Sequence, residues 1–95
     1  MSTSPAVEAV LVVLPAALIR LFPGCNQDVS LCATDVWEMI TALDRRWPGM
    51  RDRLCDSQPR VRRHIKIFVE GERATLETRL APGGEVFIMT AISGG

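Results

Sequence analysis

The sequence has no excess of charge of either sign, because eleven Lys and Arg residues are balanced by eleven Asp and Glu residues over 95 residues. A neutral chain produces no global field that would attract a polyanion, so we expect neither nucleic acid nor an anionic membrane surface as a partner. Partners must then be selected by local features of the surface.

Cysteine is scarce, and the three residues Cys25, Cys32 and Cys55 match neither a CxxC pair nor a disulfide framework. An odd set with these separations favours a reducing compartment, and we predict a cytoplasmic location. We interpret Cys32 and Cys55 as structural and Cys25 as a candidate exposed thiol. The single histidine, His64, stands at no common metal-ligand spacing from them, so we predict no metal site.

Long apolar runs are also missing. The apolar stretch 9–19 is interrupted by Pro15 and ended by Arg20, which leaves it shorter than the ~20 residues of a bilayer span. No basic segment precedes it as in a signal peptide, and we expect no membrane partner. The 47% hydrophobic content favours one ordered domain with a single core over a disordered chain.

Several segments have the patterns of β-strands. Residues 9–14 are continuously apolar, which predicts a fully buried central strand over 8–14 that ends at Pro15. Residues 27–33 alternate, with Val29, Leu31 and Ala33 on one face, as in a half-buried strand. The remaining expected strands are residues 64–69, a short edge strand at 75–78 after a turn at 70–73, and a last strand that begins at Glu85 after a turn at 82–84.

One helix signal is clear, and it lies between the second and third strands. Asp35 can cap its N-terminus, and Glu38 can reach back to complete a capping box. Pro48 and Gly49 then stop the helix. An apolar stripe runs along it, with Trp37 at the margin as a core-edge residue, and it consists of Val36, Met39, Ile40, Leu43 and Trp47. Single helical turns are expected within 16–22 and 50–55.

This order of elements predicts an α+β fold, the β-grasp or ubiquitin-like roll, with a mixed four- to five-stranded sheet and one main helix packed across it. The last strand should lie parallel to the first at the centre of the sheet. We expect a flexible N-terminus at 1–7, a β-grasp domain at 8–91 and a flexible tail at 92–95 that ends in Gly94 and Gly95.

These features resemble the MoaD/ThiS family of prokaryotic sulfur carriers over almost the whole chain. The matching stretches are the capped helix 35–43 with its end at 47–49, the strand 65–71, and the run 82–89 continuing into 91–95. The length and the loop 50–63 are most similar to the carriers of cysteine biosynthesis or of thio-siderophore pathways. Molybdopterin and related pathways stay open.

The resemblance implies a carrier that is a substrate of other enzymes and not itself an enzyme. The carboxylate of Gly95 would be adenylated by a ubiquitin-activating-like enzyme and converted to a thiocarboxylate that donates sulfur to a biosynthetic enzyme. Gly94 would be a spacer without a Cβ, which suits a tail that threads a narrow channel. No cofactor would be bound, because ATP and the sulfur source belong to the activating system.

A docking surface for these partners is expected on the sheet. If Val86 and Ile88 face the helix, then Phe87 and Met89 lie on the opposite face with Phe68 and Lys66, and Ile92 and Ser93 of the tail would join the contact. Alternatively, the long loop 15–26 covers that face. We interpret the basic cluster of Arg60, Arg62, Arg63 and His64 as a solvated loop in preference to a contact with an acidic partner.

Two other functions stay open at this point. The chain could be a ubiquitin-like binding module or small subunit that acts by surface contact alone. It could also be a protein modifier whose terminal glycine is joined to lysines on other proteins, and Lys66 would then be the single internal acceptor.

Overall fold

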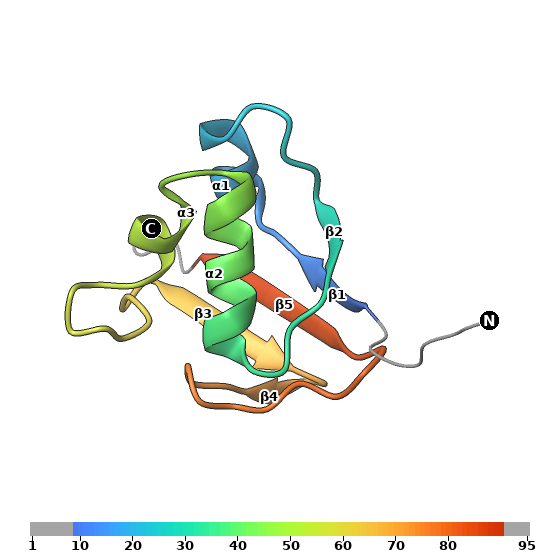
Figure 1. Ribbon diagram of the computed structural model, residues 1–95. Helices are drawn as coiled ribbons and strands as arrows, with labels where there is room; N and C mark the ends of the chain where they lie inside the picture. The colour runs from blue at the N-terminus through green and yellow to red at the C-terminus, as the bar shows by residue number, and fades with distance from the viewer. Residues whose placement is uncertain (1–8, 91–95) are drawn as a thin grey trace.

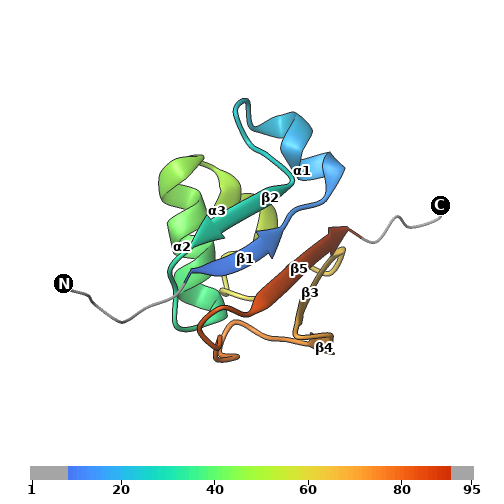
Figure 2. The same ribbon diagram turned by 90° about the vertical axis from the view of Figure 1, so that its right-hand side faces the viewer.

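A computed structural model describes residues 9–90, which form a five-stranded mixed sheet and three helices (Figure 1). The helix α2 lies across one face of the sheet (Figures 1 and 2). The elements are β1 (Val10–Val13), α1 (Ala16–Leu21), β2 (Asp28–Leu31), α2 (Val36–Arg46), α3 (Met50–Leu54), β3 (Ile65–Val69), β4 (Glu72–Arg73) and β5 (Glu85–Thr90).

The strand order is β2-β1-β5-β3-β4, so the last strand occupies the middle of the sheet. It runs parallel to β1, with Val12 opposite Val86, and antiparallel to β3, with Ile67 opposite Ile88. The predicted β-grasp roll, with a central last strand parallel to the first, is confirmed. The prediction that β1 is fully buried is wrong in one respect: Val10 and Val12 are buried, but Leu11 and Val13 are only half-buried on the outer face.

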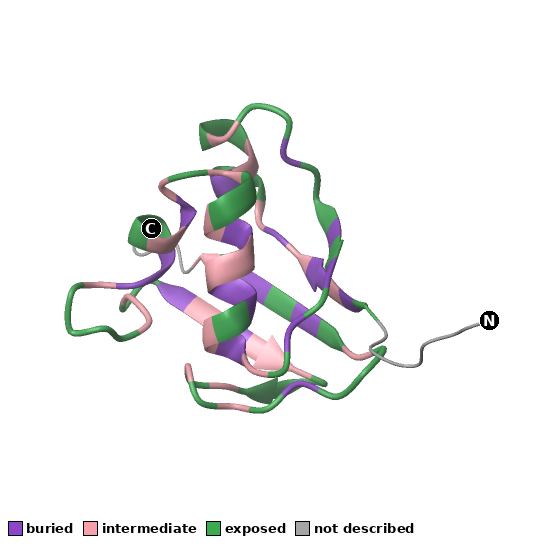
Figure 3. Cartoon of the chain, in the orientation of Figure 1, coloured by how far each residue is buried: buried purple, intermediate pink, exposed green. Residues whose placement is uncertain are grey.

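The core lies between the inner face of the sheet and α2 (Figure 3). In β2, β3 and β5 alternate residues are buried, as strand geometry requires. From α2 the expected stripe contributes four buried side chains, Val36, Met39, Ile40 and Leu43. Trp47 differs from the expectation because it is the half-buried C-cap residue, whose N–H donates to the Leu43 carbonyl at 2.8 Å.

The cap of α2 is shifted by one residue from the expected box. Asp35 Oδ1 accepts from the Glu38 N–H at 2.8 Å, as predicted. The Glu38 carboxylate, however, accepts from the backbone N–H and the hydroxyl of Thr34, at 2.9 and 2.7 Å, because Thr34 offers two donors. These hydrogen bonds lower the pKa of the Glu38 carboxyl from its ordinary value.

The two short helices α1 and α3 bury Leu18, Met50 and Leu54 at the ends of the core. Gly49, the N-cap of α3, has φ +102°, a conformation that glycine adopts readily. Asp44 of α2 accepts from the N–H groups of Gly49 and Arg51 at 3.1 and 3.0 Å. A side chain from the preceding helix thereby caps α3.

The edge strand of the sheet is not where the sequence predicted it. Glu70 and Gly71 both have positive φ and form a tight turn, so the pairing with β3 begins at once and β4 is Glu72–Arg73. Residues 75–78 form a turn of their own, in which the Thr78 hydroxyl accepts from the Thr75 N–H at 2.9 Å. The threonine side chains thus satisfy backbone groups that a strand would have paired.

Candidate functional site

The outer face of the sheet carries exposed apolar side chains. Phe87 is 41% exposed and Met89 is 51% exposed on β5, while Phe68 and Lys66 of β3 are half-buried beside them. The loop 15–26 therefore leaves Phe87 and Met89 accessible, and the alternative that this loop covers them is wrong. We call Val13, Lys66, Phe68, Phe87 and Met89 together the outer sheet patch.

The register of the strands explains why these residues gather. Val13 is opposite Phe87, Phe87 is opposite Phe68, and Phe68 is opposite Arg73, so one row crosses four strands. The Arg73 guanidinium lies 6.0 Å from the centre of the Phe68 ring. In the next row Lys66 is opposite Met89. The patch is apolar in its middle, and two cationic side chains, Arg73 and Lys66, flank this apolar centre.

The described part of β5 ends at Thr90, which is opposite Ile65, the first residue of β3. The tail residues for which we predict function lie outside the described residues, and they are Ile92, Ser93, Gly94 and Gly95. The structure shows the end of β5 at Thr90, after which these residues follow in the sequence. This point is at the same end of the sheet as Lys66 and Met89.

The basic cluster lies directly before β3. Arg60 is exposed and pairs loosely with Asp56, with 3.9 Å between Nε and Oδ2. Arg62 Nε donates to the Asp52 carbonyl at 2.7 Å. Arg63 and His64 are exposed. Asp56 also accepts from the N–H groups of residues 58 and 60, and these hydrogen bonds lower its pKa.

The interpretation of two of the cysteines was wrong. Cys25 is only 7% exposed, and burial raises the pKa of its thiol. Cys32 is the exposed thiol, because it continues the outward phase of β2 next to buried Leu31. Cys55 is buried as expected, and its pKa is raised by burial and by the nearby Asp56 carboxylate. The alternation of exposed and buried residues along β2, which is visible in the sequence, was the signal that could have shown Cys32 to be exposed.

A cleft of about 900 Å³ lies between the start of α2, the loop 59–61 and the segment 73–79. Its lining includes Trp37, Val61, Leu76 and Arg79. Trp37 is half-buried at the edge of the core, as predicted, and the Arg51 guanidinium lies 5.4 Å from its ring centre. Sequence reasoning missed the cleft because three segments distant in the chain form it.

Within residues 9–90 no group of three or more His, Cys, Asp or Glu side chains is arranged to hold a metal ion. Over the same range no helix has the length and apolar character needed to cross a membrane.

Comparison with known proteins gives structural neighbours but no sequence match. No model of a protein family matches the chain, and no curated protein sequence does. One chain of the Amycolatopsis orientalis BexX/CysO complex aligns over 92% of this chain and 100% of its own length, with 27% identity and a TM-score of 0.81. Mycobacterium tuberculosis CysO aligns over 87% of this chain and 99% of its own, with 27% identity and a TM-score of 0.78.

An archaeal protein shares the fold at lower identity. SAMP1 from Haloferax volcanii covers 93% of this chain and 100% of its own length, with 23% identity and a TM-score of 0.78. The fold and these neighbours define a small ubiquitin-like protein of the carrier or modifier class. Within that class the chain is similar to sulfur carriers of the MoaD/ThiS type.

Proposed function

We propose that this protein is a sulfur carrier whose C-terminal Gly95 is activated as an adenylate and then holds sulfur as a thiocarboxylate. The observation that carries the proposal is the alignment of nearly the whole chain with CysO structures at 27% identity. The Gly94-Gly95 pair, which follows the central strand β5 in the sequence, supports it. ATP and the sulfur donor are used by the partner, so the carrier itself needs no bound cofactor.

The chemistry is acyl transfer at the terminal carboxylate. A carboxylate oxygen of Gly95 attacks the α-phosphorus of ATP, and pyrophosphate leaves. Hydrosulfide then attacks the acyl carbon, AMP leaves with the oxygen, and the proton of the sulfur goes to solvent. The carrier supplies the carboxylate and the surfaces that partners recognise, while the groups that stabilise the phosphates belong to the activating enzyme.

We propose the outer sheet patch as the surface that partners recognise. Its exposed apolar centre with flanking cations has the composition of an interface core. It lies on the strand that leads directly to the tail. We expect an adenylating enzyme and a sulfur-accepting biosynthetic enzyme to use this patch in turn, in the cytoplasm, where ATP is available.

The test is an incubation with the ubiquitin-activating-like enzyme of the same genome, ATP and sulfide. The mass of the intact carrier is then measured by mass spectrometry. Replacement of one oxygen by sulfur at Gly95 is the expected result. The same mass shows whether Gly95 is the last residue of the mature chain. A variant that lacks Gly95 is the control, and it should show neither adenylate nor mass change.

Two outcomes would contradict the proposal. The first is a tail-deleted variant that is fully active in its pathway, which would favour a binding module. The second is an isopeptide adduct on other proteins without any thiocarboxylate, which would favour a modifier.

A further inference from the structure

The net charge of zero conceals a separation of charge along the sheet. Residues 51–66 contain six Lys and Arg residues and two Asp residues, whereas residues 70–85 contain four Glu residues and two Arg residues. The first segment leads into β3 and the second follows it, so opposite charges gather at opposite ends of the same strand. These two segments together form an electric dipole that is directed roughly along β3.

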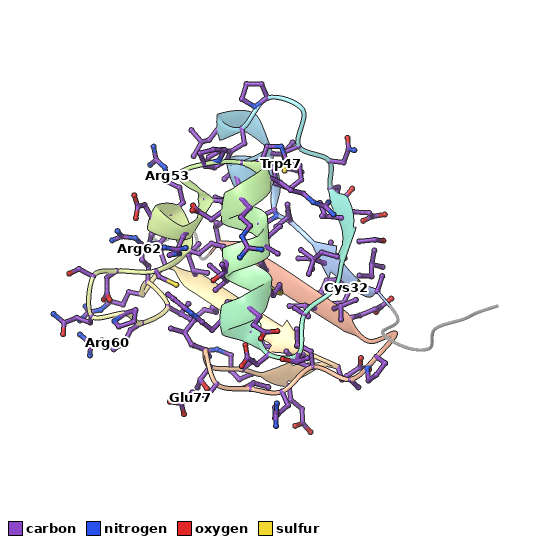
Figure 4. The ribbon with its side chains drawn as sticks, in the orientation of Figure 1. Cys32, Trp47, Arg53, Arg60, Arg62 and Glu77 are labelled. Atoms are coloured by element: carbon purple, nitrogen blue, oxygen red, sulfur yellow. The ribbon has the colours of Figure 1, made fainter. Side chains whose placement is uncertain are left out.

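We call Arg53, Arg62, Arg63, His64 and Lys66 the basic end. Arg53, Arg60 and Arg62 lie on the same side of the molecule, by α3 and the loop after it (Figure 4). Two adjoining hollows of about 400 and 560 Å³ share Arg62 and His64 in their lining. Guanidinium groups that line a hollow can bind a carboxylate with two parallel hydrogen bonds.

Most of the positive charge at this end is not neutralised by the rest of the described chain. Among residues 9–90 the ion pairs within 4.0 Å are those of Arg51 with Asp44 and of Arg60 with Asp56. Neither Arg53 nor Arg63 has a carboxylate of residues 9–90 at that distance. Within the described part of the chain, these guanidinium groups are thus available to an acidic group of a partner.

The basic end is also next to the point from which the tail extends. His64 immediately precedes Ile65, which is opposite Thr90, the last described residue of β5. Lys66 is opposite Met89 and belongs to both the basic end and the outer sheet patch. A protein that grips the tail must therefore come close to these side chains.

We propose that the basic end is a second docking surface, which binds an acidic face of the enzyme that activates the tail. The carboxylates at the far end of β3 are repelled by the same acidic face, so the dipole turns the tail toward its partner during approach. This proposal names a partner surface for the function proposed above and rests on that function. A protein is favoured over nucleic acid because the chain has no net positive charge and its acidic end would repel a long polyanion.

The experiment compares two pairs of charge reversals with the same total charge. Arg53→Glu with Arg63→Glu alters the basic end, and Arg20→Glu with Arg45→Glu alters exposed arginines outside both charged segments. Pyrophosphate exchange with the cognate activating enzyme gives kcat/KM for the carrier. At low salt we expect a loss of at least ~10-fold for the first pair and less than about twofold for the second.

Salt distinguishes an electrostatic role from a loss of shape. The Debye length falls from ~10 Å at 0.1 M to ~3 Å at 1 M salt, so the kcat/KM values of the two variant pairs should converge as the salt concentration rises. If the Glu pair does not fold, Arg53→Gln with Arg63→Gln gives the same comparison with a smaller effect. Equal kcat/KM for the two pairs at low salt would overturn the docking surface while leaving the carrier function intact.

A binding measurement keeps the inference separate from the proposed function. NMR titration with a hexaglutamate peptide should shift the amide signals of residues 53 and 62–66, and the Arg53/Arg63 variant should lose these shifts. Shifts spread equally over all exposed arginines would mean a solvated loop without a site. Tighter binding of a single-stranded oligonucleotide than of the peptide would replace the protein partner by nucleic acid.

Discussion

Gly84→Ala tests how the central strand is anchored at its start. A Cβ at residue 84 would lie 2.6 Å from Glu70 Oε2 and 3.0 Å from the Ala81 carbonyl oxygen. The Glu70 carboxylate can swing away, but it then loses the hydrogen bond that it accepts from the Glu85 N–H at 2.8 Å. The Ala81 oxygen is backbone and is also the acceptor of the Gly84 N–H, so it moves less easily.

The magnitude follows from three terms. The lost hydrogen bond costs about 1 kcal/mol, and the contact with the Ala81 oxygen adds up to about 1 kcal/mol of strain. Replacing glycine by alanine restricts the unfolded chain and returns about 0.5 kcal/mol. We expect a net destabilisation of about 0.5 to 1.5 kcal/mol, which corresponds to a decrease in Tm of roughly 2–12 °C for a domain of this size.

The assay is urea unfolding followed by circular dichroism, with a double-mutant cycle. Glu70→Ala alone removes the hydrogen bond, so Glu70→Ala with Gly84→Ala should be less destabilised than the sum of the single variants. Strict additivity would show that Glu70 does not mediate the effect. A Gly84→Ala variant as stable as the parent chain would refute the steric argument altogether.

Three further predictions follow from the same structure. Phe68→Ala with Phe87→Ala should weaken binding of the activating enzyme at least ~10-fold by calorimetry with an unchanged CD spectrum, and unchanged affinity would remove the outer sheet patch as a docking surface. Cys32 should react with a maleimide well before the two buried cysteines in mapped mass spectra, and equal rates would contradict the burial. Because the pKa of Glu38 is lowered in the folded state, its stabilising contribution is present above its unfolded pKa and is lost as pH falls through the folded value. Glu38→Gln should flatten the acid side of the stability profile, and an unaltered slope would contradict the hydrogen bonds from Thr34.

The sequence could predict the features that depend on short spacing along the chain. The alternation around Val29 and Leu31 placed β2, and the cap at Asp35 placed the start of α2, because strand and helix periods are local properties. The exposure of Phe87 relative to Val86 and Ile88 follows from the same period, once the helix is assigned to one face. The same reasoning identified four of the five residues of the outer sheet patch, all except Val13.

Other features depended on partners that the local pattern does not name. The turn at Glu70 and Gly71 shifted the edge strand to β4, since left-handed φ values at two consecutive residues reverse the chain earlier than the composition suggested. Asp44 caps α3 because the helices α2 and α3 turn back on each other. Cys25 is buried because its segment folds onto the core, which no spacing reveals.

The sequence by itself determined the β-grasp order of elements and the resemblance to the MoaD/ThiS family, and it directed attention to Gly94 and Gly95. Periodicity and the order of elements are properties of the chain, so they could be established before any contact was known. Only the tertiary structure decided that Phe87 and Met89 are accessible. The arginines before β3 lie beside the end of β5 because residue 65 of β3 is opposite residue 90 of β5. This pairing joins residues that are far apart in the chain, so only the tertiary structure could show it.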